Sequence, residues 1–586
     1  MLKVDTQPSS RPVTRYFPFA SGLVALLTML LITFFAHFVL FPQFGIYEDD
    51  YILTLPVMKW SAAELPAHLW TTLTQPTFGR PINFFFRQLI FFFTVRDGHL
   101  QSGFLFSLLL IAVNGYLFFL LLRRQLGFRA GFVGAIFYLL YPVDTSRQIL
   151  MHQTDMHLGA TILLVAFLLY QNQKVLLAFV VAALSLLVCE WWYLPFLAAP
   201  LIFPRQDRKW FRDLLLHALI FFAIAGGVFF GRNLLGEQRA HQVLGDVGQL
   251  PLRMIGACTL GPLISAEAAF LRPIDAILHA EPYGYFLGLI SAGFLVLVLW
   301  RARGADSDVK PAETEIPRAR MLLMFLGGIL AWSFSYFLSF LDDYYPPVMT
   351  IGRLSAVHTV GTFGAAICFA ICFKLAYQAL SGRFFWPLVI ALSIYFGSLV
   401  AFGVHIQISE YVTNRNQQKE VWKAIIRQIP DINDGDVVLF EHSADPKVMP
   451  ITQGFGSFAA ATYFPMALPF FVNFPKSWQE IPRVYGVFPG CEYEDLAQGR
   501  KLHTPFWAPT LWPVIRDGHF IYLRVEGGQL RRIIEPVQIL GRVFQPKINS
   551  PDMVKPLQST SLFRNIFGEP DSRRWFTLRN AKFYPR

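Results

Sequence analysis

Three adjacent carboxylates, Glu48, Asp49 and Asp50, stand between two tyrosines just after the first long apolar run of the chain. Like charges at close range beside a low-dielectric membrane disfavour one another's ionised form, so such a group can accept a proton near neutral pH. We therefore take Asp49 and Asp50 as candidate catalytic bases and Glu48 as a residue lining the same site. A solvated loop that ends the preceding helix is the alternative explanation.

Three arginines stand where a phosphate group would be met at a membrane surface. Arg80 lies in Gly79-Arg80-Pro81 before a very aromatic stretch, Arg147 follows a polar turn, and Arg353 precedes an apolar run. The planar guanidinium group binds phosphate oxygens in a bidentate manner. These residues are our candidates for binding a donor phosphate, while an arginine that snorkels to the membrane interface is the alternative for Arg80.

Five further side chains are candidates for lining the site: Tyr141, His152, Asp155, Glu190 and His358. His152 and Asp155 have the i, i+3 spacing that would let them share a helix face and hold a divalent cation, although a hydrogen-bonded loop is the reading we favour. Glu190 suits a structural hydrogen bond as well as a site role, and His358 suits a satisfied buried histidine. No metal-ligand cluster has the expected spacing.

The composition indicates the kind of scaffold that must position these residues. The chain has 586 residues, of which 54% are hydrophobic and 15% charged, whereas soluble globular proteins carry about 25% charged residues. This excludes a soluble enzyme of ordinary composition and predicts an all-α polytopic membrane protein. The formal net charge of +11 comes from basic residues that flank apolar runs, so we expect membrane lipid and no nucleic acid as partner.

Apolar runs of a length that can cross a membrane predict about eleven transmembrane helices. The first, Phe19 to Leu40, follows a short basic arm and has no small-residue cleavage site, so we expect an uncleaved anchor with a cytoplasmic N-terminus. The other expected spans are 103–122, 130–142, 156–171, 175–189, 191–204, 214–231, 284–300, 321–341, 354–376 and 384–404.

The basic residues assign sides to the loops. Short loops that carry Arg123, Arg124, Lys174 and Lys209 fall on the expected cytoplasmic side when eleven spans alternate. The first domain is then 1–404, a multi-pass plasma-membrane unit with outer loops at 43–101 and 232–283. The second domain, 405–586, is expected outside the cytoplasm.

The C-terminal domain differs in composition from the rest of the chain. Runs such as Asp436–Phe440 and Phe520–Val525 are rich in Val, Ile, Phe and Tyr and stand between Gly and Pro breakers. This pattern predicts a small α/β or mostly β domain. We find no chemical motif in it.

Taken in order, these motifs resemble the GT-C class of membrane-embedded glycosyltransferases, which includes the protein mannosyltransferases. Asp49-Asp50 is similar to the acidic pair in that family's first outer loop, and Gly79-Arg80-Pro81 is similar to the Gly-Arg-Pro that commonly follows. His99 to Asn114 resembles the segment leading into the next span. The remaining matches are Tyr141-Pro142-Val143-Asp144-Thr145 and Glu190 with Pro195.

The match covers about residues 16–205 and contains departures. Tyr141 stands where many members have the histidine of a His-Pro loop, Ser146 replaces an acid, and Cys189 precedes Glu190 in place of a lysine. No single motif is diagnostic of the class. The order, spacing and sidedness of the motifs carry the resemblance jointly.

The resemblance implies an inverting glycosyltransferase that moves a sugar from a polyprenyl-phosphate carrier to an acceptor hydroxyl outside the cytoplasm. Asp49 or Asp50 would take the acceptor proton, and Arg80, Arg147 and Arg353 would hold the departing phosphate. The acceptor is a protein, a lipid or a glycan. The donor is the lipid-linked sugar, and a divalent cation stays open as a cofactor.

Two other functions fit parts of the pattern. A polymerase or ligase of lipid-linked polysaccharide would use a pyrophosphate-linked oligosaccharide at the same place. A lipid or glycolipid flippase or transporter would also need many spans and basic residues near phosphates, but the charged residues cluster at the outer ends of the spans, and the sequence has no paired inverted repeats. The pattern GxxxxGK[ST] of an ATP-driven pump is absent from the sequence.

Overall fold

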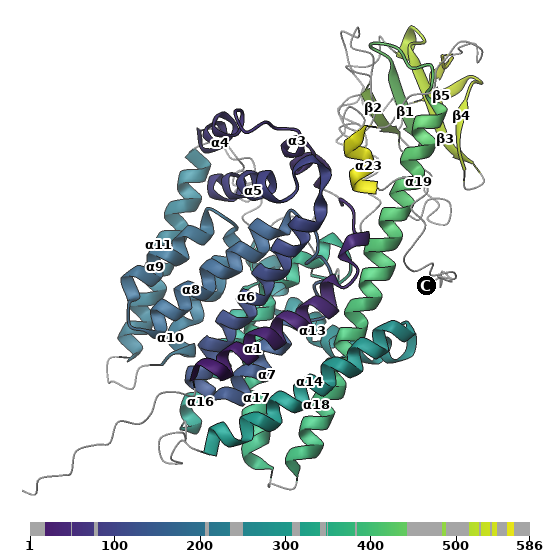
Figure 1. Ribbon diagram of the computed structural model, residues 1–586. Coiled ribbons are helices and arrows are strands. Elements are labelled where there is room, and N and C mark those ends of the chain that lie inside the picture. Colours follow the sequence, from purple (N-terminus) through teal and green to yellow (C-terminus); the bar gives the residue numbers. More distant parts are fainter. Residues whose placement is uncertain are drawn as a thin grey trace, which may run out of the picture.

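The computed structural model describes residues 18–47, 50–74, 80–204, 210–234, 250–307, 317–339, 347–348, 350–380, 384–441, 483–487, 515–526, 529–539, 542–547 and 560–567. In these ranges the chain forms a large bundle of helices, and one long helix connects the bundle to a small sheet (Figure 1).

Eight helical segments of the described ranges are long and apolar enough to cross a membrane. The protein is therefore an α-helical membrane protein, as the composition predicts. The segments are Gly22–Gln43, α6 (Leu100–Leu126), Gln153–Gln171, α11 (Trp210–Leu234), α13 (Leu250–His279), α14 (Pro282–Ser307), α17 (Gly361–Ala379) and Phe385–Gln428. Two shorter apolar helices accompany them, α7 (Phe128–Leu140) and α9 (Val175–Leu186). The helix α16 (Arg318–Phe334) packs against α17. The count of eleven spans stays a prediction.

Two segments differ from the sequence expectation. The expected span 191–204 is a 3₁₀ helix, η5 (Glu190–Ala198), followed by the single turn α10 (Ala199–Ile202). Pro195 lies inside η5, where it has no N–H to donate, so a regular α-helical ladder does not form. In the expected outer loop 232–283, α13 is itself long and apolar enough to cross a membrane despite the prolines at 262 and 273.

A group of short helices lies over one end of the bundle (Figure 1). They connect the first apolar helix, α1 (Pro18–Thr33) with η1 (Phe34–Phe38), to α6. They are α2 (Asp50–Leu53), α3 (Leu55–Met58), α4 (Leu65–Thr74), α5 (Pro81–Thr94) and η3 (Arg96–Gly98). Proline at the first position of α5 suits a helix start, where its missing N–H leaves no gap in the ladder.

Three π-helical turns interrupt the described bundle: η1, η4 (Gln153–Leu158) and η8 (Gln407–Val412). A π turn widens the helix and leaves backbone groups without their usual i−4 partners. Gln407 supplies such partners to η1, since its Nε2 donates to the carbonyls of Phe35 and Ala36 and its Oε1 accepts the Leu40 N–H. The first and last long segments of the bundle are thereby joined.

The helix α18 (Phe385–Ile406) continues through η8 into α19 (Thr413–Gln428), which reaches the C-terminal sheet (Figure 1). In this sheet β1 (Val437–Glu441) pairs in parallel with β2 (Arg483–Val487) and with β3 (Phe520–Glu526). The antiparallel β4 (Gln529–Ile533) completes it, and β5 (Val537–Ile539) forms a hairpin with β6 (Arg542–Phe544). Strands therefore form at both of the predicted positions.

The helix α23 (Ser561–Phe567) lies between the sheet and the bundle (Figure 1). Its Asn565 side chain donates to the carbonyl of Asp97 in η3, and its Leu562 side chain lies against Gly98. The sheet and the short helices α3 to α5 lie at the same end of the bundle in Figure 1. Which side of the membrane this end faces stays a prediction.

Candidate functional site

The start of α5 forms an ion-pair cluster with the start of η5. Arg80 donates from Nε to Oε2 of Glu190 at 2.9 Å and from Nη2 to Oε1 of the same carboxylate. Arg232, at the end of α11, lies 3.5 Å from Oε2 of Glu190. The three side chains retain 18%, 20% and 13% exposure for Arg80, Glu190 and Arg232. Two guanidinium groups thus converge on one partly exposed carboxylate.

The electrostatics of this cluster follow from its geometry. Burial alone would raise the pKa of the Glu190 carboxyl, but the charges of Arg80 and Arg232 and the Arg80 hydrogen bonds outweigh it and lower that pKa to about 2. Glu190 is therefore ionised at neutral pH. In the same pair, the Glu190 charge raises the pKa of Arg80 above its ordinary value against the opposing effect of burial.

A second, buried set of contacts fixes α5 below this cluster. Asn83 donates to the carbonyl of Val188 and accepts the hydroxyl of Thr154. Arg87 donates to the Thr154 hydroxyl and pairs with Asp155 at 3.5 Å. These bonds attach α5 to η4 and to the turn before Glu190, so they determine where Arg80 lies.

His152 and Asp155 do not act as a pair. The Nδ1 of His152 bonds to the carbonyl of Ser146 at 2.9 Å, while Asp155 turns to Arg87. The contacts favour the hydrogen-bonded reading of this segment over the cation site. Among the described residues, no group of three or more His, Cys, Asp or Glu side chains is placed to hold a metal ion.

Asp50 is fully buried at the start of α2. Its Oδ1 accepts the N–H of Met151 at 2.9 Å, and its Oδ2 accepts the N–H of Tyr47 at 3.2 Å. The carboxylate therefore joins residues 47–51, which we call the acidic segment, to the loop that precedes η4. Glu48 and Asp49 lie outside the described residues.

The loop after α7 carries a buried ion pair between Asp144 and Arg147. Asp144 accepts hydrogen bonds from Ser146 and Thr359 and lies 3.5 Å from Nε of Arg147. Burial opposes ionisation of Asp144, but Arg147 and the two hydroxyl groups lower its pKa below the ordinary value. Tyr141, at the start of this loop, is also buried.

Arg147 is directed into the protein in this structure. Its Nη1 donates to the carbonyls of Tyr138 and Leu139, at 3.3 and 2.6 Å, and its side chain is 5% exposed. Arg147 therefore belongs to the internal network around Asp144, and Arg80 to the partly exposed cluster at Glu190.

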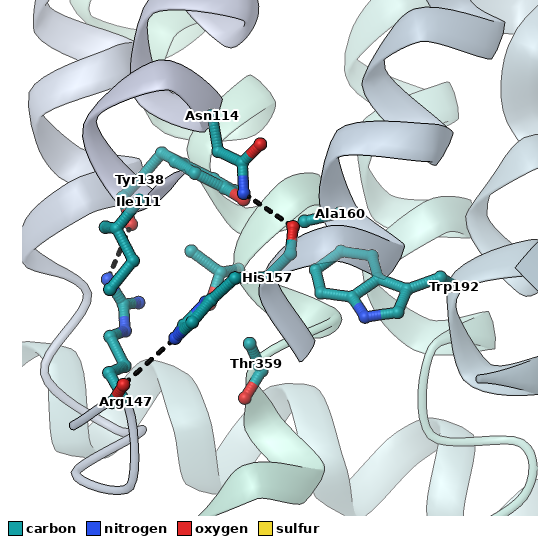
Figure 2. A pocket seen from close by; sticks show the side chains of 9 residues that line it. Ile111, Asn114, Tyr138, Arg147, His157, Ala160, Trp192 and Thr359 are labelled. Atoms are coloured by element: carbon teal, nitrogen blue, oxygen red, sulfur yellow. Dashed lines mark hydrogen bonds between the residues drawn. The ribbon is translucent and has the colours of Figure 1, made fainter. Parts of the chain in front are cut away.

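A small cavity lies beside Arg147, at the point where α6, η4, η5 and the start of α17 meet. Figure 2 shows Arg147, His157 and Trp192 around it, with Asn114 on one side and Thr359 on the other. His157 Nε2 bonds to the carbonyl of Arg147 at 2.9 Å. The cavity has room for about one water molecule, so it is too small for a sugar.

The other predicted residues lie on η6 (Arg353–His358). The Nδ1 of His358 bonds to the hydroxyl of Tyr336 at 2.9 Å, and the imidazole is fully buried. Ser355, on the same helix, accepts the N–H of Thr145. The Arg353 side chain lies outside the described part of the structure.

Arg87 and Arg232 are site residues that the sequence analysis missed. Arg87 stands in a run of phenylalanines, where a charge needs a partner if the helix is packed on both faces. Arg232 stands at the end of an apolar run, which reads as a helix boundary. The position of Arg87 among apolar residues could have indicated a buried ion pair. The partner of Arg232 depends on tertiary structure and could not have been found from the sequence.

Comparison of the chain with family models, curated proteins and solved structures found no match.

Proposed function

We propose that this membrane protein is an inverting glycosyltransferase that moves a sugar from a polyprenyl-phosphate carrier to an acceptor hydroxyl on the extracytoplasmic side. One observation carries the proposal, namely the convergence of Arg80 and Arg232 on the partly exposed Glu190. A phosphate group offers more oxygens and more negative charge than a carboxylate, so two guanidinium groups that reach the same carboxylate suit a phosphate ligand.

The position of Arg80 supports this role. It precedes α5, a helix rich in phenylalanine that lies over the end of the bundle (Figure 1). Phe86 and Phe93 of α5 are 38% and 72% exposed. A guanidinium group at the start of a helix that exposes aromatic side chains is suited to meet the phosphate of a lipid whose chain lies in the membrane.

The acidic segment supplies the base in this proposal. Because Asp50 is buried and accepts two backbone N–H groups, we assign it the role of holding the segment. Its neighbour Asp49 is assigned the role of proton acceptor. Both carboxylates were equal candidates on sequence grounds alone.

The proposed reaction is a single displacement. The acceptor oxygen forms a bond to the anomeric carbon while the bond from that carbon to the phosphate oxygen breaks. Asp49 takes the acceptor proton, and Arg80 with Arg232 stabilises the charge on the departing polyprenyl phosphate. Attack from the face opposite the leaving group inverts the anomeric configuration.

The test is transfer by the purified protein in lipid nanodiscs with a panel of polyprenyl-phosphate sugars. Parent, Asp49→Asn, Asp50→Asn and Arg80→Gln proteins are compared by mass spectrometry of the lipid product and by the anomeric configuration of the glycoside. We expect release of polyprenyl phosphate by the parent and loss of transfer in Asp49→Asn and Arg80→Gln.

Arg96→Gln is the matched control, since Arg96 is an exposed arginine at the same end of the bundle, paired only weakly with Asp97 at 3.8 Å. Full transfer by a folded Asp49→Asn protein would remove the assigned base. Consumption of pyrophosphate-linked oligosaccharides alone would replace the proposal with the polymerase or ligase reading. Movement of the lipid across the bilayer without cleavage would replace it with a flippase.

A further inference from the structure

One face of the helix from η8 to α19 contacts the acidic segment. Tyr411, Arg415 and Gln418 follow one another at spacings of four and three residues, which places them on one side of a helix. Trp422, Ile425 and Ile429 continue the same stripe toward the sheet and are fully buried. The stripe thus begins at the acidic segment and ends beside the C-terminal sheet.

The contacts at the lower end of the stripe hold the segment on both sides of the acids. The Tyr47 hydroxyl donates to the carbonyl of Tyr411 at 2.9 Å and accepts the N–H of Gly45 at 2.8 Å. After the acids, the Tyr51 hydroxyl donates to Oε1 of Gln418 at 2.7 Å. Both tyrosines are buried.

The same helix also holds the loop that binds Asp50. The Tyr411 hydroxyl donates to the carbonyl of Thr145 at 2.7 Å. That loop supplies the Met151 N–H that Asp50 accepts. Tyr411 therefore contacts the two segments that Asp50 joins, one through its backbone and one through its side chain.

Arg415 connects this arrangement to the end of the described chain. Its Nη2 donates to the carbonyl of Ile566 in α23 at 2.9 Å, and its side-chain stem lies against Gly45, where a Cβ would stand 2.9 Å from Cγ of Arg415. The helix α23 in turn packs on η3 through Leu562 and Asn565. In Figure 1, α23 and α19 lie side by side between bundle and sheet.

We propose that Gln418 and Tyr411 are positioning residues for the acidic segment, and that docking of the C-terminal domain through α23 determines how firmly they hold it. The role of Gln418 and Tyr411 in catalysis rests on the proposed function. The coupling between the docking of α23 and the position of the acidic segment does not. Transfer activity then depends on a domain that carries none of the candidate bases or arginines.

The physical reason is the kind of contact involved. Four hydrogen bonds join the acidic segment and its neighbouring loop to residues distant in sequence. Three of them involve a backbone carbonyl or N–H group, and the fourth ends on the side-chain amide of Gln418. Such bonds fix a segment only while both partners keep their places, and a segment that loses them opens more readily. A change in the position of α19 is therefore passed directly to the segment.

Hydrogen–deuterium exchange of the full-length protein in nanodiscs tests the coupling without reference to activity. We expect about 5- to 10-fold faster exchange of peptides covering 44–58 in Gln418→Leu, because the buried hydrogen bond that holds Tyr51 is lost together with the bond from Gln418 to Asn414. Gln418→Glu keeps the acceptor for Tyr51 but loses the donor to Asn414, so its exchange should be slower than that of Gln418→Leu and faster than that of the parent. Glu420→Gln, on the exposed face of α19, is the control.

The second arm separates coupling from local contact. Leu562→Asp places a charge in the buried contact with Gly98 and should release α23. Faster exchange of 44–58 in this variant as well as in Gln418→Leu supports the proposal. Faster exchange in Gln418→Leu alone overturns the role of the C-terminal domain, and unchanged exchange in both overturns the whole proposal.

Activity supplies the third arm. We expect Gln418→Leu to lower kcat for sugar transfer about tenfold with little change in KM, and Gln418→Glu to recover part of it. If the parent protein has no transfer activity, the proposed function is wrong. The exchange measurements still test the coupling in that case. A Gln418→Leu protein with faster exchange of 44–58 but unchanged kcat would contradict the positioning role.

Discussion

Arg80 and Glu190, 110 residues apart, form a two-pronged ion pair that joins the start of α5 to the start of η5. The pair lies at a partly exposed position, and Arg232 reaches the same carboxylate from α11. Three segments that belong to different parts of the chain are thereby brought to one point. The phosphate-binding role that we propose for this point makes specific predictions.

Arg80→Gln should slow sugar transfer by about 100- to 1000-fold, because one preorganised donor to the departing phosphate is lost, and Arg80→Lys should slow it less. Lysine keeps the charge but cannot make the parallel two-bond contact, so it should recover only part of the rate. Steady-state kinetics with the preferred donor measures the effect. Equal rates for Arg80→Gln and the Arg96→Gln control would show that Arg80 is only structural.

Glu190→Gln should lower thermal stability at neutral pH, and the difference from the parent should disappear in acid. The folded pKa of about 2 lies below the ordinary carboxyl value of 4.5, so ionised Glu190 stabilises the fold above 4.5 and this contribution is lost as pH falls toward 2. Unfolding curves of both proteins across that range measure it. A stability difference that persists at the acid end would contradict the assignment of the ion pair.

Several parts of the molecule follow from local sequence and others do not. Apolar length predicts the spanning helices, and strand-forming runs between Gly and Pro predict β1 and β3, because these signals lie within single elements. Pro195 breaks an apolar run into η5 and α10, whereas α13 continues through Pro262 and Pro273 in a segment that the sequence analysis assigned to an outer loop. A proline in the sequence shows where one helical N–H is missing. It does not show whether neighbouring helices supply a partner for the carbonyl that loses its hydrogen bond.

The candidate site shows the same limit. Arg80 and Glu190 each stood out in the sequence, but nothing in the spacing of residues indicated that they pair. Helical spacing predicts that Asp155 and His152 share a helix face, whereas in the structure Asp155 forms an ion pair with Arg87 on another helix and His152 bonds to a backbone carbonyl. Partners more than about one helical turn apart are determined by packing, which periodicity does not encode.

Gly98→Ala should release α23 from the bundle, whereas Gly127→Ala should not. Both glycines have positive φ, +82° and +86°, so alanine strains each backbone by roughly 1–3 kcal/mol. Only at Gly98 would the new Cβ meet a neighbour, at 2.8 Å from Cδ1 of Leu562, while Gly127 has open space. Limited proteolysis of the C-terminal domain measures the release. Equal cleavage of the two variants would mean that Gly98 serves only its own turn.

Gln407→Leu should destabilise the bundle more than its buried position alone suggests. Its side chain accepts the Leu40 N–H and donates to the carbonyls of Phe35 and Ala36, which the π turn η1 exposes. Leucine fills similar space but leaves these groups without the amide, at a cost of roughly 1–3 kcal/mol for each buried unsatisfied group.

Ser398→Ala, on the same long helix, is the matched control for Gln407→Leu. Ser398 donates only to the carbonyl of Ile394 one turn earlier, a group that the helix ladder already uses. We therefore expect a large fall in the unfolding temperature for Gln407→Leu and little change for Ser398→Ala, measured in the same detergent. Similar falls in both would mean that η1 satisfies its own backbone groups and that α18 does not hold the first helix through Gln407.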